Sequence, residues 1–200
     1  MKSKTVKLTS KKSFLSFYLD NFTISLSHLE TKNIEKIIDQ LVLLKKRKGR
    51  LFLIGIGGSA ANCSHAVNDF RKIAKIETYA ASDNIAELTA RINDEGWDGI
   101  FSSYLEGSHL SKNDMVFILS VSGGDLIKNK SINIVHAILY AKKIGSTILA
   151  IVGAGGGFTK ESADYVIEIK TERNELIIPF AESMQSVIWH AIVNHPKLTS

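Results

Sequence analysis

Residues 51–69, LFLIGIGGSAANCSHAVND, decide the fold. They begin with an apolar run, Leu51–Ile54, pass through Gly55, Gly57 and Gly58, and continue into a series of small residues. This order is typical of a buried strand, a tight turn and the first turn of a helix. The free N–H groups and partial positive charge of such a helix N-terminus favour an anion, and a phosphate is the simplest candidate.

Three polar side chains on the same segment can bind a ligand or move a proton. Ser59 adds a hydroxyl donor beside the glycine turn. His65 and Asp69 are four residues apart, so on a helix they share one face. One short segment therefore offers an anion site together with side chains suited to acid–base chemistry or to a metal ion.

The composition predicts one folded domain. A chain of 200 residues with 44% hydrophobic residues has ample material for a core. The single cysteine, Cys63, excludes an internal disulfide, fits a reducing compartment and is expected to be a packed thiol. No apolar run approaches the roughly 18 residues of a membrane span, and the first residues lack the apolar core of a signal peptide. We therefore expect a cytoplasmic protein with no membrane partner.

The formal net charge is +5, and the cations are concentrated in two places. One is the run KKRKGR at residues 45–50, which we interpret as a solvated helix end where the helix dipole favours cations. A nucleic-acid patch is the alternative, but no aromatic residue is interleaved in this run. Nucleic acid is therefore not expected as a partner. The other group, at the N-terminus, comprises Lys2, Lys4, Lys7, Lys11 and Lys12.

Strand-like and helix-like segments alternate along the rest of the chain. Strands are expected at residues 76–81, 115–121, 147–152 and 165–169, and helices at 85–92, 97–105, 131–144 and 179–194. Near-continuous apolar strands between helices predict an α/β protein whose parallel sheet is covered on both faces.

Two apolar helices, 10–29 and 31–46, precede the first strand, and Asn33 is a candidate cap for the second. Their apolar stripes are wide for surface helices. We therefore divide the chain into an N-terminal segment, 1–49, that packs on the domain and on a partner subunit, and a domain at 50–200.

A second group of hydroxyls follows the apolar strand at 115–121. Ser120 and Ser122 flank its carboxyl end, where open α/β sheets bind ligands. Ser131, which begins the next helix, would by itself be interpreted as a cap. Together with the glycine–serine turn at 57–59, a shared phosphate site is the better account.

Taken together, these residues resemble the sugar isomerase (SIS) domain family, and within it the phosphoheptose isomerases, over essentially the whole chain. The resemblance implies a flavodoxin-like three-layer sandwich with five parallel strands and two leading helices, assembled as a homotetramer. Five motifs carry it: Gly57-Gly58-Ser59 with His65, Asn93-Asp94-x-Gly96, Ser120-x-Ser122-Gly123, Ser131-x-Asn133, and Glu182 eight residues before His190.

The resemblance also implies roles for the matching residues. Asp69 and His190 would transfer the proton, and Asn93, Asp94 and Glu182 would contact the sugar. The sugar phosphate would be bound by Gly57, Gly58, Ser59, Ser120, Ser122 and Ser131. One zinc ion per subunit would be held by His65, Asp69, Glu182 and His190, and no nucleotide cofactor is implied.

The implied reaction is an aldose–ketose isomerisation through an enediol, which converts sedoheptulose 7-phosphate to D-glycero-D-manno-heptose 7-phosphate. Such a reaction needs one group to carry a proton and another to manage the charge that develops on oxygen. A carboxylate and a histidine suit these roles, although Asp69 would be a poorer base if it also held the metal.

Several positions depart from the family pattern. Ile56 stands where Asn is usual, Asp69 replaces Glu, Val121 replaces Thr and Glu182 replaces Gln. Residues 124–130 are an insertion, which is expected to lie over the mouth of the site. These differences concern the substrate more than the fold.

Two other functions are weighed against the isomerase. The first is a non-catalytic SIS module that binds a protein or senses a sugar phosphate, and the retention of a histidine and an acid on both helices argues against it. The second is a nicotinamide dehydrogenase, because Gly55-x-Gly57-x-x-Ala60 formally matches the dinucleotide fingerprint. Gly58-Ser59 and the second serine turn are better explained by a monophosphate.

Overall fold

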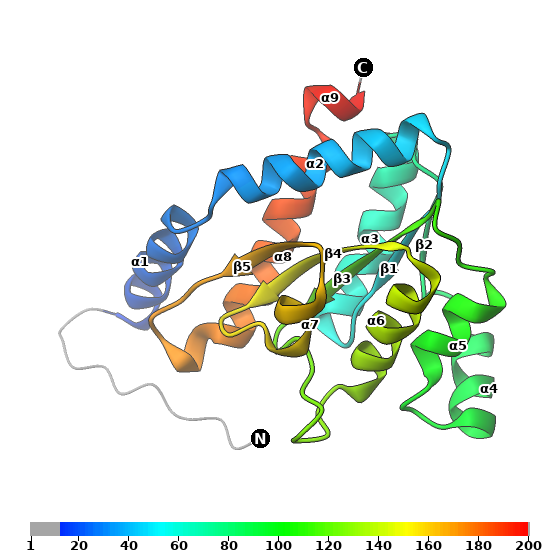
Figure 1. The fold of residues 1–200 in the computed structure, drawn as a ribbon. Coiled ribbons are helices and arrows are strands. Elements are labelled where there is room, and N and C mark those ends of the chain that lie inside the picture. The colour runs from blue at the N-terminus through cyan, green and yellow to red at the C-terminus, as the bar shows by residue number, and fades with distance from the viewer. Residues whose placement is uncertain (1–12, 200) are drawn as a thin grey trace.

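One five-stranded parallel sheet forms the centre of the structure, a computed structural model that describes residues 13–199 (Figure 1). The strand order β2-β1-β3-β4-β5 confirms the expected flavodoxin-like α/β fold. The chain changes direction across the sheet between β1 and β3, which is the place where such sheets bind ligands. The strands are β1 (Leu51–Ile54), β2 (Thr78–Ala80), β3 (Met115–Ser120), β4 (Thr147–Gly153) and β5 (Tyr165–Ile169).

Helices cover both faces of the sheet, so the fold has three layers (Figure 1). Successive strand residues point to opposite faces: Leu53 packs into one core cluster and Phe52 into the other. Both faces are apolar, which explains the unbroken hydrophobic strands. The first face carries α2 (Thr31–Lys46), α3 (Gly58–Lys72) and α8 (Ile177–Val193), and the second carries α4 (Ile85–Glu95), α5 (Ile100–Gly107), α6 (Ile132–Ile144) and α7 (Gly157–Ser162).

The two leading helices differ in how they pack. In α2, the side chains of Ile37 and Leu41 are fully buried in the first core cluster. In α1 (Phe14–Ser27), Tyr18 and Phe22 meet the ring of Phe180 edge-on at 5.0 and 5.3 Å, while most of the helix is exposed. The division at residues 49 and 50 stays a prediction, and residues 10–12 of the expected first helix lie outside the described range.

Several expected boundaries differ from those of the structure. Helix α4 continues through 93–95, because Arg91 forms ion pairs one turn away on either side, and it ends at Gly96, whose φ is 83°. Strand β2 is shorter than expected, and α5 begins at Ile100 rather than at residue 97. Helix α8 begins at Ile177, after a 3₁₀ turn at Asn174–Leu176, and Pro179 lies in its first turn, where no N–H is needed.

The cap expected for α2 is also wrong. Glu30 occupies the N-cap position without a side-chain cap, and Asn33 Nδ2 donates to its carboxylate at 3.0 Å. At the other end of the chain, Pro196 begins a short helix, α9 (Pro196–Thr199), that packs on α2.

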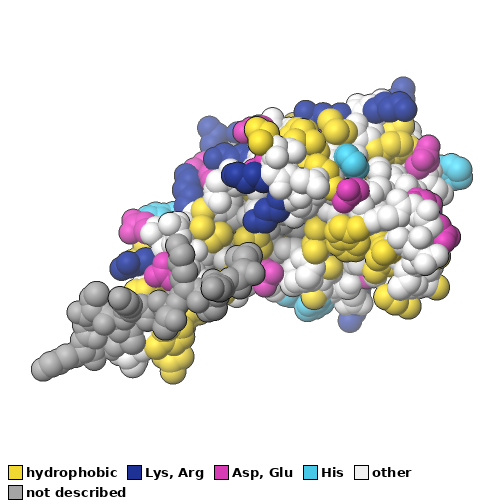
Figure 2. All heavy atoms as spheres, turned by 90° about the horizontal axis from the view of Figure 1, so that it is seen from below, with side chains coloured by type: hydrophobic (Ala, Val, Ile, Leu, Met, Phe, Trp, Pro, Cys, Tyr) yellow, Lys and Arg dark blue, Asp and Glu magenta, His cyan; other side chains and the backbone are white. Residues whose placement is uncertain are grey.

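The cations of residues 45–50 mostly bind main-chain oxygens. Lys45 Nζ donates to the carbonyl of Leu198 at 2.7 Å, and Arg47 Nε donates to that of Asn113 at 2.8 Å. These contacts agree with the expected helix end, and the absence of a nucleic-acid partner stays a prediction. Figure 2 shows acidic side chains between lysines and arginines on the face seen from below. The N-terminal lysines expected to add to the basic charge, Lys2 to Lys12, lie outside the described residues.

One described segment, Asn174–Val193, is long and apolar enough to cross a membrane by length and composition alone. Half of it is buried inside the fold, and Met184, Ile188 and Trp189 belong to the first core cluster. The core helix of a folded domain passes the same test, which is how we interpret α8. Cys63 is buried in the same cluster, as expected, and this burial raises the pKa of its thiol.

Candidate active site

A cavity of about 480 Å³ lies at the carboxyl ends of β1, β3 and β4. The four serines expected to hold a phosphate all line it: Ser59, Ser120, Ser122 and Ser131. The strand order brings them together, because β1 and β3 are neighbours and both end at this edge of the sheet. The remaining lining residues are Ile56, Val121, Lys130, Ala154, Asn174, Ile177, Ile178 and Glu182.

The serines are held in different ways. Ser59, in the first turn of α3, is 1% exposed, and its Oγ has no hydrogen-bond partner among residues 13–199. A buried hydroxyl without a partner indicates a ligand position. Ser120 Oγ accepts from the N–H of Gly123 at 3.0 Å. Ser131 occupies the N-cap position of α6, yet its side chain caps none of the described helix N–H groups. The cap interpretation of Ser131 is therefore wrong, while the cavity position agrees with a binding role.

Main-chain contacts fix the turn that carries Ser120 and Ser122. Gly123, at φ 70°, lies so close to the next glycine turn that a Cβ would overlap the carbonyl oxygen of Gly156. The carbonyl of Gly123 accepts from Thr159 N–H at 2.9 Å and from Thr159 Oγ1 at 2.7 Å. The carbonyl of Gly124 accepts from Phe158 N–H at 2.9 Å. Residues of helix α7 therefore hold the serine turn in place.

A second cluster, of acid–base side chains, lies where α3 packs against α8. His65, Asp69 and His190 each offer a ligand atom, and these atoms lie within 4.8 Å of one another. His190 Nε2 is 3.8 Å from Asp69 Oδ2. His190 Nδ1 is 2.8 Å from the carbonyl oxygen of Ser186, so this nitrogen donates its proton there and Nε2 is left to face Asp69.

Glu182 does not belong to this cluster. It lies two turns before His190 on α8, about 12 Å away along the helix axis. Its carboxylate lies against the first turn of α3, where a Cβ at Gly58 would be 2.5 Å from Oε2. A carboxylate is favoured at this helix N-terminus. The structure thus brings together three of the four expected metal ligands and places the fourth at the serine cavity.

The other expected site residues do not line the serine cavity. Gly57 is the N-cap of α3 with φ 62°, a backbone conformation that favours glycine, but neither it nor Gly58 lines the cavity. Asn93 and Asp94 are exposed on the last turn of α4, where Asn93 Nδ2 donates to Asp94 at 2.8 Å. They do not join the serines within this chain, so their contact with the sugar stays a prediction.

Sequence reasoning did not assign two other groups at the site. Lys130 lines the cavity directly before Ser131 in the chain, and its position inside the insertion could have indicated it. Asn62 joins the two helices, because its Nδ2 donates to the carbonyl of Glu182 at 2.9 Å and its Oδ1 accepts from Trp189 Nε1 at 3.4 Å. No sequence motif marked Asn62.

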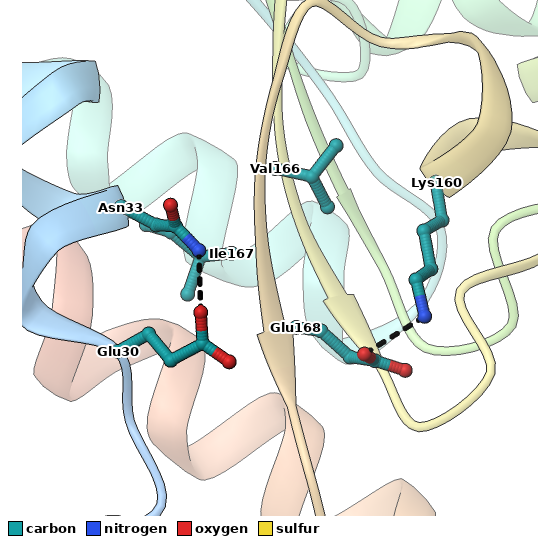
Figure 3. A pocket seen from close by; sticks show the side chains of 6 residues that line it. All are labelled: Glu30, Asn33, Lys160, Val166, Ile167 and Glu168. Atoms are coloured by element: carbon teal, nitrogen blue, oxygen red, sulfur yellow. Dashed lines mark hydrogen bonds and ion pairs between the residues drawn. The ribbon is translucent and has the colours of Figure 1, made fainter.

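Another pocket, of about 310 Å³, lies beside edge strand β5 (Figure 3). Its charged groups are paired: Lys160 with Glu168 at 2.9 Å, and Glu30 with Lys170 at 2.6 Å. Asn33 also donates to Glu30, as Figure 3 shows. This pocket carries no histidine or serine, so it offers no chemistry like that of the serine cavity.

Comparison with known proteins agrees with this geometry. Residues 17–153 match the model of a family described as SIS domain. The chain belongs to the SIS domain family. It is 32% identical over 168 residues to a probable phosphoheptose isomerase of Thermoplasma volcanium, a match that covers 82% of each chain. It is 30% identical to phosphoheptose isomerases of Mycobacterium tuberculosis strains, over 78% of this chain and 77% of theirs.

Among solved structures, a phosphoheptose isomerase of Neisseria gonorrhoeae has the same fold as this SIS domain protein. The TM-score is 0.77 at 19% sequence identity, over 90% of this chain and 93% of that one. At this identity the likeness establishes the architecture alone.

Proposed function

We propose that this SIS domain protein is an isomerase that interconverts an aldose and a ketose carrying a phosphate. The more specific proposal is conversion of sedoheptulose 7-phosphate to D-glycero-D-manno-heptose 7-phosphate. The names of the relatives support it. One observation carries it: His190 faces Asp69 at 3.8 Å on the same two helices, α3 and α8, that line the serine cavity with Ser59 and Glu182.

The spacing along the helices favours a long substrate. Ser59 and Asp69 are ten residues apart, about 15 Å along α3, and Glu182 and His190 are about 12 Å apart along α8. A phosphate at the serines therefore lies well away from the Asp69–His190 pair. An extended sugar with its phosphate on one end and its carbonyl at the other bridges more of this separation than a three-carbon sugar does.

Asp69 and His190 are proposed as the catalytic pair. Asp69 takes a proton from C1 of the ketose, and the C–H electrons form the C1–C2 double bond of the enediol as His190 gives a proton to the C2 oxygen. His190 then takes the proton from the C1 oxygen, the O–H electrons form the C1 carbonyl, and Asp69 returns its proton to C2, which yields the aldose with no net change in protons. The serines hold the phosphate so that both carbons stay in reach.

The cluster also fits a zinc ion. Two imidazoles and a carboxylate, with the non-ligand nitrogen of His190 bonded to a main-chain carbonyl, form a donor set typical of zinc with an open position. His65, Asp69 and His190 would hold the ion, and when bound it would polarise the sugar carbonyl. Glu182, against Gly58, is proposed to accept a hydrogen bond from a sugar hydroxyl instead.

A homotetramer in the cytoplasm is the accompanying proposal. Exposed apolar side chains on α1, including Leu15 and Leu19, support contact with further copies of the chain.

Turnover of sedoheptulose 7-phosphate by the purified protein, with and without chelator, tests the proposal. We expect His190→Ala to lower kcat by at least about a hundredfold, because one partner of proton transfer is lost. The fold should be retained, since the side chain of His190 is 41% exposed. His28→Ala, at an exposed histidine, is the control. An unchanged kcat at saturating substrate would reject the role of His190.

Zinc binding separates the metal proposal from catalysis. Titration of the metal-free protein with zinc should give about one site per chain, and His65→Ala should weaken it at least tenfold. If the wild-type protein binds no zinc and keeps its full turnover after chelation, the metal proposal is wrong. The proposed acid–base pair, Asp69 and His190, is then unaffected.

The alternative is a binding module that senses a sugar phosphate without converting it. It predicts phosphate-dependent binding with no turnover for any ketose phosphate of five to seven carbons. The Asp69–His190 contact favours the enzyme, because sensing alone requires no such pair.

A further inference from the structure

One positively charged side chain lines the serine cavity, and the proposed function assigns it no role. Lys130 lines the cavity together with Ser122 and Ser131. Its ammonium group has neither a hydrogen bond nor an ion pair within residues 13–199. Two residues earlier, Lys128 forms an ion pair with Asp125 at 3.3 Å and does not line the cavity. The two lysines of one loop therefore have different environments.

The backbone holds Lys130 at this place. Its N–H donates to the carbonyl of Asp125 at 3.0 Å, and its own carbonyl accepts from Asp125 N–H at 2.9 Å. Asp125 Oδ1 also accepts from the N–H groups of Ile127 and Lys128, each at 3.0 Å. Residues 125–130, here called the strap, are thus closed at their base directly before Ser131. The strap lies in the loop that projects from the carboxyl end of β3 at the bottom of Figure 1.

The charges around the cavity make this cation significant. Lys130 and Glu182 are the charged residues among the described ones that line it. The serine hydroxyls are neutral, and the Glu182 carboxylate repels a phosphate dianion. Ser59 Oγ is buried without a partner among the described residues, so an oxygen of a ligand bound in the cavity would complete its hydrogen bonding. An ammonium group at the rim offsets the carboxylate and attracts the dianion.

We propose that Lys130 binds the phosphoryl group of the substrate and so selects phosphorylated sugars over neutral ones. The inference rests on the proposed function, from which it takes the phosphate. Lysine is suited to this task because its ammonium group is a compact charge with three rotatable donors. Lys130 acts on binding and not on proton transfer, which occurs at the Asp69–His190 pair.

The matched substitutions Lys130→Met and Lys128→Met test this assignment. Binding of inorganic phosphate is measured by calorimetry, and KM and kcat are measured with sedoheptulose 7-phosphate. We expect Lys130→Met to raise the phosphate Kd and the KM about tenfold and to leave kcat within about twofold. Lys128→Met should behave as wild type, and Lys130→Arg should restore most of the affinity. Added salt should weaken phosphate binding more in wild type than in Lys130→Met.

Ser122→Ala separates the failure of this inference from the failure of the proposed function. If Ser122→Ala weakens phosphate binding and Lys130→Met does not, the cavity binds phosphate without Lys130 and the inference is overturned. A loss of kcat at unchanged KM in Lys130→Met overturns it as well. If phosphate does not bind to wild type at all and no ketose phosphate is converted, the proposed function itself is wrong.

Discussion

Ser131 has an unfavourable backbone conformation and lines the serine cavity, where we propose that it binds the phosphate. Its φ of 47° and ψ of 44° lie in the left-handed region, which costs a residue with a Cβ about 1 kcal/mol or more. The hydroxyl caps none of the described helix N–H groups, so the helix gains nothing from it. The position on the cavity wall supplies the reason to keep a hydroxyl there.

Replacing Ser131 with glycine should therefore separate stability from binding. We expect Ser131→Gly to leave the free energy of unfolding unchanged or to raise it by up to about 1 kcal/mol, because the strain is relieved. Its KM for the sugar phosphate should rise severalfold. Ser131→Ala, which loses the hydroxyl but keeps the strain, should show the same KM without the gain in stability. A clear loss of stability in Ser131→Gly would contradict the strain argument.

Single residues were predictable where chemistry and strand ends coincide. Ser59, Ser120 and Ser122 follow strands that the apolar runs revealed, so their shared edge could be expected. Glu182 was expected both to contact the sugar and to hold the metal, and the metal role came only from its match to a family position. In the structure, its carboxylate instead lies at the helix N-terminus beside Gly58.

At the scale of elements, an ion pair joins the amino ends of β1 and β3. The Arg50 guanidinium contacts the Asp114 carboxylate at 2.7 Å, and Asp114 is 3% exposed. Burial acts to raise the pKa of Asp114, but hydrogen bonds from Arg50 and Ser111 outweigh it, so the pKa lies below its usual range. Ser111 N–H and Oγ both donate to Oδ2 at 2.9 Å. The pair therefore fixes the register of two neighbouring strands opposite the site.

The depressed pKa of Asp114 predicts how stability depends on pH. Its contribution is fully present above the unfolded pKa of about 3.9 and is lost as the pH falls through the lower folded value. We expect Asp114→Asn to lower the free energy of unfolding by about 2 kcal/mol at pH 7. The free energy of unfolding is measured with urea at pH 7 and at pH 3. The difference between wild type and Asp114→Asn should be smaller at pH 3. A gap that stays constant over this range would show that the charge is not responsible.

Element types could be read from periodicity, whereas some ends could not. The buried strands were evident from runs such as MVFILS, because both faces of a parallel sheet are covered. The polar stretch at 93–96 read as a loop, yet ion pairs of Arg91 with Glu87 and Glu95 extend α4 to Gly96. Such ion pairs form only once the helix exists, so the polar composition of this stretch does not reveal that they stabilise the helix end.

At the scale of the whole molecule, α1 presents an apolar surface. Leu15 is 69% exposed and Leu19 is 61% exposed, although both belong to a helix whose other side packs on α8. Hydrophobic side chains so exposed on one helix are typical of a surface covered by another subunit. The wide apolar stripe in the sequence favoured the same interpretation, which stays a prediction, and the number of subunits depends on geometry between chains.

The double substitution Leu15→Glu and Leu19→Glu should break the proposed assembly. We expect the molar mass measured by light scattering to fall towards that of one chain, because charges cannot be buried in the contact. Far-UV circular dichroism should stay unchanged, since neither side chain is in the core. Ile85→Glu, at a residue that is 67% exposed on α4, is the matched control. An unaltered mass in the double variant would place the subunit contact elsewhere.

The close contact between the turns at Gly123 and Gly156 limits which parts of the site can change in evolution. Main-chain atoms and Thr159 hold the Ser120–Gly123 turn, and side chains such as Val121 take no part in holding it. Mutations at Val121 or Ile56 can thus alter the shape and polarity presented to a sugar while the anchor point for its charged end stays where it is. Proteins with this fold can therefore change the sugar that they accept without moving the turn proposed to bind its phosphate.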